Sequence, residues 1–195
     1  NKETAHQLGT PISALVAWVE YLRLQPENET ICQEITKDIN RLDMITKRFS
    51  QIGTNPELTP INIIPIIEGA MNYLCSRSSK KVIYDINLPK EEEIILPINQ
   101  CLLEWVLENL SKNAIDAMGG IGTLSLEMSQ DNKRVIIDIS DTGKGMQKKE
   151  FKKIFEAGYT TKERGWGMGL SLAKRIIEEY HHGKIFVKQS VIGKG

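Results

Sequence analysis

The sequence predicts an α-helical hairpin followed by an α/β two-layer sandwich. Residues 5–24 and 28–52 carry apolar side chains at alternating spacings of three and four, which is the seam of a helical bundle. Beyond residue 60, segments with helical periodicity alternate with short strand-like segments, which is the pattern of a mixed α/β layer structure. Between the two parts, the Gly, Pro and Asn content of residues 53–60 indicates a linker.

The predicted hairpin is too thin to bury its own apolar face. Its first helix carries the seam Leu8, Ile12, Leu15, Val19 and Leu22, and the second carries Ile31, Ile35, Leu42, Ile45, Phe49 and Ile52. Two such hairpins from two chains make a four-helix bundle, so we expect a homodimer. The alternative is a hairpin packed on the rest of its own chain, which the linker disfavours.

The elements expected after the linker follow in a simple order. We expect one domain over residues 1–53, a linker over 54–60 and a second domain over 61–195. In the second domain, the predicted helices are 61–78, 98–118 and 169–181, and the predicted strands are 82–88, 93–96, 123–128, 134–139 and 184–190, with a turn at residues 131–132.

Composition excludes some classes of function. The 25 Lys and Arg residues balance the 25 Asp and Glu residues, so no net charge favours nucleic acid or an anionic membrane surface as a partner. The three scattered cysteines, Cys32, Cys75 and Cys101, predict buried, reduced thiols in the cytosol. No apolar run reaches the ~20 residues of a membrane span. The sequence opens inside an expected helix and closes just after a strand-like run, so we expect a piece of a longer protein whose other parts carry a sensor or a membrane span.

His6 is the first candidate for chemistry. At about 100° per residue, His6 lies opposite the apolar seam of its helix, with Thr10 beside it. We therefore expect an exposed imidazole, which is a competent nucleophile near neutral pH. Pro11 should bend the helix near this site. The alternative is an ordinary surface histidine.

Two asparagines on the predicted helix 98–118 form the second candidate site. Asn109 and Asn113 are one turn apart and point the same way, at the rim of the apolar face. Amide oxygens suit a hard cation that keeps water and phosphate ligands, which is Mg²⁺. Glu108 and Lys112 lie on another side of the helix and can pair. The alternative for the asparagines is capping or solvation.

Three glycine-containing loops follow. Residues 141–146 come directly after an apolar strand, residues 154–162 combine glycine with aromatic side chains, and residues 164–170 place three alternate glycines before a helix. The first permits close backbone approach to a ligand, the second predicts a mobile lid, and the third suits a phosphate cradle. Each loop alone could be an ordinary turn or a flexible surface loop, but their order and spacing are specific.

Taken together, these residues resemble the sensor histidine kinases of two-component signalling, over essentially the whole chain. Residues 6–11 resemble the phospho-acceptor box, 108–116 the N box, 141–145 the G1 box, 155–162 the F box and 165–169 the G2 box. The resemblance implies that the first domain is a dimerisation and phospho-acceptor hairpin. It implies that the second is an ATP-binding catalytic domain of the histidine kinase, gyrase and Hsp90 type.

The resemblance also implies roles for single residues. His6 would accept the phosphoryl group, Gln7 would stand beside it and Thr10 would serve phosphatase activity. Asn113 would ligate Mg²⁺ and Asn109 would assist in metal binding and catalysis. Asp141 would bind the adenine amine, with Gly143 and Gly145 shaping the adenine pocket. The remaining contacts to ATP would come from Lys112, Thr161, Lys162, Gly165, Gly167, Gly169 and Leu170.

Two departures from the family pattern shape the expected mechanism. Gln7 replaces a common acid, and an amide cannot act as a base, although it can orient the imidazole ring. Asp116 and Ala117 replace a basic and an aromatic residue, so Lys112 or Lys162 would supply the missing phosphate contact.

The implied activity is ATP-dependent autophosphorylation, with transfer to an aspartate of a response regulator receiver domain. We expect a cytoplasmic protein, or the cytosolic part of an inner-membrane sensor. Two alternatives remain. One is a dimeric ATP-binding regulator with weak or no kinase activity, which Gln7 motivates. The other is an ATP hydrolase, which Asn109 disfavours because it stands where hydrolases carry a glutamate.

Overall fold

The computed structural model describes residues 2–33, 35–36, 39, 56–89, 93–131, 134–162, 167–193 and 195; the side chains of residues 2–11 and 26 lie outside this description. The chain divides into two compact units, Asn1–Pro56 and Glu57–Gly195. No helix in the described part is long and apolar enough to cross a membrane.

The first unit is helical where it is described. Helix α1 (Lys2–Leu22) is followed by the 3₁₀ turn η1 (Pro26–Asn28), and residues 29–33, 35, 36 and 39 are helical again. Ile12 and Val19 of α1 pack with Cys32 and Ile39 in one buried cluster. The predicted second helix continues to residue 52, and its residues 40–52 lie outside the described part. The complete hairpin therefore stays a prediction.

Among the described residues, two small sheets organise the second unit. Strands β1 (Thr59–Asn62) and β3 (Ile95–Ile98) pair antiparallel. Strands β2 (Val82–Asn87), β4 (Gly122–Gln130) and β5 (Val135–Asp141) form the second sheet in the order β2-β4-β5, with β2 parallel and β5 antiparallel to β4. The register sets Leu124 opposite Asp141, so the last residue of β5 lies beside the start of β4.

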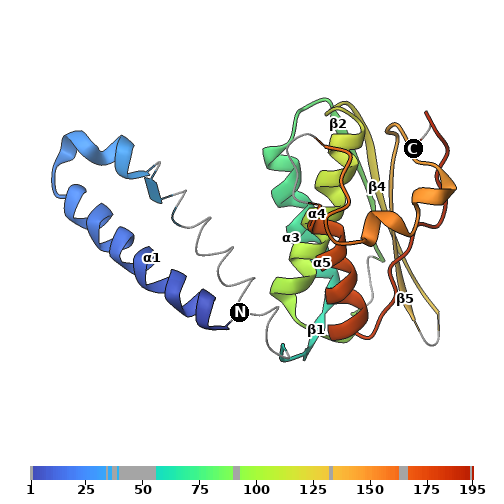
Figure 1. The fold of residues 1–195 in the computed structure, drawn as a ribbon, viewed down its shortest axis with the longest axis horizontal. Coiled ribbons are helices and arrows are strands. Elements are labelled where there is room, and N and C mark those ends of the chain that lie inside the picture. The colour runs from blue at the N-terminus through green and yellow to red at the C-terminus, as the bar shows by residue number, and fades with distance from the viewer. Residues whose placement is uncertain are drawn as a thin grey trace. The chain divides into compact units, whose positions relative to one another are not determined.

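Three helices cover one face of the larger sheet. Helices α3 (Ile63–Arg77), α4 (Gln100–Ala117) and α5 (Gly169–Arg175) lie on the same side of the strands (Figure 1). Asn62 and Asn99 cap α3 and α4 by accepting hydrogen bonds from the backbone N–H groups of Ile64 and Leu102, respectively. This mixed α/β sandwich agrees with the predicted fold class.

The buried side chains between helices and sheet form the core. Leu124, Leu126 and Met128 alternate along β4 and face the helices, as the period of a strand requires. Leu103 and Leu107 of α4 pack on the same cluster. These contacts fix one face of α4 against the sheet, and Leu102 and Val106 of α4 pack in a second cluster with Ala173 of α5.

Helix α5 continues into a π-helical turn, η4 (Ile176–Tyr180), which ends at His181. The ring Nε2 of His181 accepts a hydrogen bond from the backbone N–H of Asn99 at 3.0 Å. Its proton therefore sits on Nδ1, 2.9 Å from the carbonyl oxygen of Ile176. His181 thus ties the start of α4 to the end of η4. His182, with φ of 54°, takes the left-handed conformation that closes this helix.

The predicted strand over residues 184–190 is wrong, because these residues have no regular secondary structure. Within the described part, no backbone hydrogen bond joins them to β5, and side chains make the contacts instead. Lys188 Nζ donates to Asp138 Oδ2 of β5 at 2.7 Å, and this hydrogen bond raises the pKa of Lys188. Ser190 Oγ accepts from the backbone N–H of Met146 at 2.9 Å.

The structure also differs from the predictions in some strand bounds and in the burial of the cysteines. The predicted strand 93–96 lies two residues later, as β3, and Thr59 and Pro60 of the predicted linker belong to β1. The three cysteines form no disulfide; Cys32 is buried, whereas Cys75 is exposed and Cys101 is half-buried, so the expectation of buried thiols holds for Cys32 alone.

Candidate functional site

The two predicted asparagines lie on one flank of α4, at the rim of its apolar face. Asn109 and Asn113 are half-buried, and Asp116 is exposed one turn after Asn113 on the same flank. The Nδ2 amide of Asn109 donates to the carbonyl oxygen of Trp105 at 3.0 Å, which orients that side chain. Ser111, on the other side of α4, is fully buried against Met71. The helix therefore presents amide and carboxylate oxygens together at the rim of the core.

The turn after β5 rests on the last residues of α4. Asp141 Oδ1 accepts from the backbone N–H of Gly143 at 2.8 Å, and the N–H of Lys144 donates to the carbonyl oxygen of Ala117 at 3.1 Å. A Cβ on Gly143 would lie only 2.7 Å from the carbonyl carbon of Ala117. Only glycine allows the turn to approach α4 this closely.

Gly145 is required for two reasons. Its φ of 65° lies in the left-handed region, and a Cβ there would collide with the carbonyl oxygen of Val191. The backbone N–H of Gly193 donates to the carbonyl oxygen of Lys144 at 2.8 Å. Asp141, Gly143 and Gly145 thus belong to one tight turn, which follows β5 and lies beside the end of α4.

The loop of residues 156–162 reaches over the same flank of α4. Lys162 Nζ donates to Asn113 Oδ1 at 2.7 Å and to Asp116 Oδ2 at 2.6 Å. Thr161 beside it is exposed. The sequence had suggested both Lys112 and Lys162 as phosphate contacts. Lys162 is the lysine that meets Asn113, whereas Lys112 Nζ lies 3.4 Å from Glu108 Oε2.

Hydrogen bonds to the carboxylate of Glu150 hold this loop in place. Glu150, in the 3₁₀ turn η2 (Lys148–Glu150), accepts from the backbone N–H of Gln147 at 2.8 Å and from the hydroxyl of Tyr159 at 3.0 Å. The bond from Gln147, followed by that from Tyr159, lowers the pKa of Glu150. The same contact raises the pKa of Tyr159. These hydrogen bonds therefore stabilise the ionised form of the Glu150 carboxyl group, and that carboxylate anchors the loop.

The glycines before α5 approach both the loop and α4. The backbone N–H of Gly158 donates to the carbonyl oxygen of Gly167 at 3.0 Å, and Gly167 has a φ of 62°. A Cβ on Gly169 would lie 2.9 Å from Asn109 Oδ1. Leu170, the next residue, is half-buried in the first turn of α5. The start of α5 thus meets the asparagine flank directly.

The structure brings most of the predicted site residues around one end of α4. Asn109, Asn113 and Lys162, the turn at 141–145 and the glycines at 167 and 169 all contact this helix or a neighbour of it. Gly165 lies outside the described residues. His6, Gln7 and Thr10 lie within α1, but their side chains are outside the described part, so their predicted exposure stays a prediction.

Two residues of the site escaped the sequence analysis. Asp116 was noted only as a departure from a pattern, yet it holds Lys162, and its spacing of three from Asn113 already placed it on that flank. Glu150 carried no motif. The capping box that joins it to Gln147 was the available signal.

The residues present fit a hard divalent cation and a phosphate group. The Lys162 ammonium already stands as a cation between an amide oxygen and a carboxylate oxygen, the donor types that Mg²⁺ prefers. The backbone of Ala117 fills the space that a Cβ on Gly143 would need, and the side chain of Asn109 fills that space at Gly169. Asn113 and Asn109 are the side chains suited to assist such an ion.

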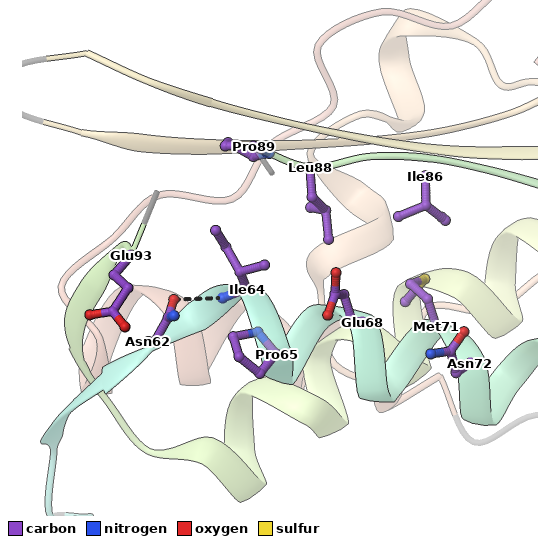
Figure 2. Close-up of a pocket in the computed structure, with 10 residues that line it drawn as sticks. All are labelled: Asn62, Ile64, Pro65, Glu68, Met71, Asn72, Ile86, Leu88, Pro89 and Glu93. Carbon is purple, nitrogen blue, oxygen red and sulfur yellow. Dashed lines mark hydrogen bonds between the residues drawn. The ribbon is translucent and has the colours of Figure 1, made fainter. Parts of the chain in front are cut away.

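A separate cavity of about 820 Å³ lies between α3 and β2. Ile64, Met71, Ile86 and Leu88 contribute its apolar lining, and Glu68 and Glu93 its charged groups (Figure 2). It contains none of the predicted nucleotide-binding residues. The site on α4 is therefore distinct from this cavity.

Comparison with known proteins gives consistent results. Residues 99–195 match the family of histidine kinase-, DNA gyrase B- and HSP90-like ATPases. The sensor histidine kinase ZraS of Salmonella typhimurium is 31% identical over 98% of this chain, which spans 42% of ZraS. The chain thus covers less than half the length of this curated relative.

Solved structures share the fold. The catalytic domain of the histidine kinase ThkA is 27% identical, with a TM-score of 0.61 over 67% of this chain and 86% of that chain. ShkA, solved at full length in complex with AMPPNP, has a TM-score of 0.71 at 21% identity, covering 99% of this chain and 43% of its own. ThkA in complex with the response regulator TrrA has a TM-score of 0.61 at 23% identity, covering 96% and 56%.

Proposed function

Because the chain belongs to the sensor histidine kinase family, we propose that it transfers the γ-phosphoryl group of ATP to the imidazole of its own His6. A nitrogen–phosphorus bond forms, the bond between the γ-phosphorus and the bridging oxygen breaks, and ADP leaves. The observation that carries the proposal is the convergence of Asn113, Lys162 and the turn at 141–145 at one end of α4. AMPPNP bound to the similar ShkA supports a nucleotide ligand.

The residues of the second unit would hold the nucleotide. Asp141, positioned by its bond to Gly143, would accept from the adenine amine, and Gly145 would keep the turn close to the base. Lys162, Thr161 and the backbone at Gly167 and Gly169 would face the phosphates. Mg²⁺ on Asn113 and Asn109, when bound, would neutralise phosphate charge.

Gln7 motivates the second candidate, a dimeric ATP-binding regulator with weak or no kinase activity. An amide can orient the imidazole of His6 but cannot take its proton, so the proton would have to leave to solvent. Hydrolysis of ATP ranks lower. Asn109 donates to Trp105 and is no base, while Glu108 interacts with Lys112.

We infer that the chain acts as a homodimer. Ile12 and Val19 are buried within one chain, whereas Leu15, Trp18 and Leu22 are 42%, 64% and 37% exposed. These three side chains lie within about 60° of one another around the helix, next to the buried pair. An exposed apolar stripe of this kind fits a second copy of the hairpin. Leu15→Glu should halve the mass measured by light scattering; an unchanged mass would refute this interface.

The phosphoryl group would then pass to an aspartate of a response regulator receiver domain. Similarity to ThkA, solved with the response regulator TrrA, supports a partner of this class. We place the division of labour at the predicted boundaries, with the acceptor hairpin over residues 1–53 and the nucleotide-binding domain over 61–195.

Incubation with γ-labelled ATP and Mg²⁺ tests the kinase. We expect acid-labile, base-stable label on the chain, and none on His6→Ala or Asn113→Ala. Two matched controls should keep the label. Asn72→Ala changes an exposed asparagine of α3 outside the site, and His182→Asn changes another histidine to a residue that tolerates its φ of 54°.

Each outcome decides between the candidates. Bound nucleotide without any label would favour the regulator. Phosphate release without a labelled protein would favour the hydrolase. Label that survives in His6→Ala would refute the assigned acceptor.

A further inference from the structure

We propose that Lys162 is a built-in counter-cation that occupies the cation position on α4 when no nucleotide is bound, and that it competes with a divalent metal ion for Asn113 and Asp116. This inference deepens the proposed function and rests on it, because the metal ion is the one expected with ATP. It assigns Asp116 a direct role that no family motif gave it.

The geometry around Lys162 is that of an ion in a site. Its ammonium donates to Asn113 Oδ1 at 2.7 Å and to Asp116 Oδ2 at 2.6 Å. The first of these distances is at the short end of the usual range for charge-assisted hydrogen bonds, about 2.7–2.9 Å, and the second is slightly shorter. Asn113 and Asp116 are three residues apart on one helix, so both oxygens point to the same place. A lysine that merely covered the surface would not need hydrogen bonds to both of these oxygens.

The same two oxygens suit a metal ion. Amide and carboxylate oxygens are hard ligands that Mg²⁺ and Mn²⁺ prefer. The ammonium and a divalent cation cannot share the position, because both would contact the same lone pairs and repel each other. Binding of the metal at Asn113 therefore requires Lys162 to withdraw.

The surrounding loop lets the side chain move while its backbone stays. Tyr159, three residues earlier, is tied to Glu150 at 3.0 Å, and Gly158 is tied to Gly167 at 3.0 Å. The lysine side chain itself is a flexible four-carbon stem, and it is 42% exposed. Only the side chain has to swing away from α4.

Withdrawal of Lys162 links two events. The metal takes the oxygens that the ammonium leaves, and the released ammonium is positioned to meet phosphate oxygens on the same side of α4. Metal and nucleotide would then favour each other's binding, because either one helps to free Lys162 from Asp116. Without nucleotide, the lysine keeps metal ions off the site.

The test uses the ¹⁵N-labelled full chain, without nucleotide, at low ionic strength. MnCl₂ is titrated while paramagnetic loss of amide signals is followed by NMR. In Lys162→Met, we expect signals of residues 113–116 to disappear at about two- to five-fold lower Mn²⁺ than in the parent, the range that corresponds to an exposed ion pair. Low salt is needed because exposed charges are screened.

The matched control is Lys112→Met. It removes one positive charge from the same helix but leaves Asn113 and Asp116 covered, since Lys112 lies 3.4 Å from Glu108. We expect its Mn²⁺ midpoint to stay near that of the parent. In Lys162→Met combined with Asp116→Asn, the gain should disappear. Signals of β4 in the same spectra show whether each variant is folded. If Lys162→Met is not folded, Lys162→Gln takes its place.

Equal Mn²⁺ midpoints for Lys162→Met and Lys112→Met would overturn the inference, as would signal loss centred away from residues 113–116. The measurement needs no kinase activity. If the chain gives the expected metal response but forms no phosphohistidine, this inference stands and the proposed kinase activity is refuted. If the chain forms phosphohistidine but Lys162→Met and Lys112→Met respond alike to Mn²⁺, the kinase activity stands and this inference is refuted.

Discussion

Gly143→Ala is the perturbation that most directly tests the arrangement of the site. The added methyl group would lie 2.6 Å from Asp141 Oδ1, 2.7 Å from the carbonyl carbon of Ala117 and 2.8 Å from its oxygen. Two of these three atoms belong to the backbone at the end of α4, so no side-chain rotation can relieve the contact. The turn has to move away from α4.

The size of the effect follows from these distances. Ordinary van der Waals contact begins at 3.4 Å, so the turn must retreat by about 0.7 Å. Overpacking of this kind costs about 1–3 kcal/mol, and the bond from Lys144 N–H to Ala117, now 3.1 Å long, would weaken with it. At about 2–4 °C per kcal/mol for a chain of this size, we expect the melting temperature to fall by about 2–12 °C.

The assay combines thermal unfolding with calorimetric titration of AMPPNP. Gly69→Ala is the matched control, because Gly69 is exposed within α3 and a Cβ there meets nothing within 4 Å. Alanine in a helix interior should stabilise by about 0.5–1 kcal/mol and leave nucleotide affinity unchanged. If both variants melt alike and bind AMPPNP alike, the close approach of the turn to α4 is not a requirement of the fold or of the site.

Three further predictions address other parts of the chain. Gln7→Glu should raise the rate of phosphohistidine formation, by up to about 10²-fold, because a carboxylate can accept the imidazole proton; an unaltered rate in quench-flow labelling would favour an orienting role for Gln7. Glu150→Gln should lower the melting temperature at pH 7. Because the pKa of Glu150 is lowered in the folded chain, its stabilisation is present above the ordinary value of 4.5 and is lost as pH falls through the folded pKa. The difference between parent and Glu150→Gln should therefore shrink in melts below pH 4.5, and a constant difference would argue against the Tyr159 contact. Leu124→Ala removes a fully buried side chain and should cost about 2–5 kcal/mol in the free energy of unfolding by urea; a cost under 1 kcal/mol would show that β4 is not packed as described.

Local patterns were enough to predict most of the architecture. The periodicity of residues 98–118 and 61–78 marked α4 and α3 to within about two residues, and alternation marked β2, β4 and β5. These signals are local because a helix face or a strand face is set by which side chains must leave water. The strand over residues 184–190 was wrong for the same reason. Its alternation is real, but a strand also needs a backbone partner, and the contacts here run through Lys188 and Ser190.

The candidate site divides in the same way. The order of the Asn-containing helix and the glycine loops, and the choice of Asn113, Asp141 and Gly143 as candidate site residues, come from motif spacing in the sequence. Lys162 and Asp116 are 46 positions apart, and only the folded chain brings their charged groups to 2.6 Å. His181 likewise meets Asn99 across 82 positions.

The sequence by itself predicted α3, α4, β2, β4 and β5, their apolar faces, and the residue types that suit a nucleotide. Tertiary structure alone decided which lysine meets Asn113, how tightly the 141–145 turn presses on α4, and that residues 184–190 contact β5 by side chains. The physical reason is how far apart in the sequence the interacting residues lie. Periodicity and capping depend on neighbours within a few residues, whereas an ion pair or a backbone contact between distant segments exists only after the core of Leu124, Leu126 and Leu107 has set their distance.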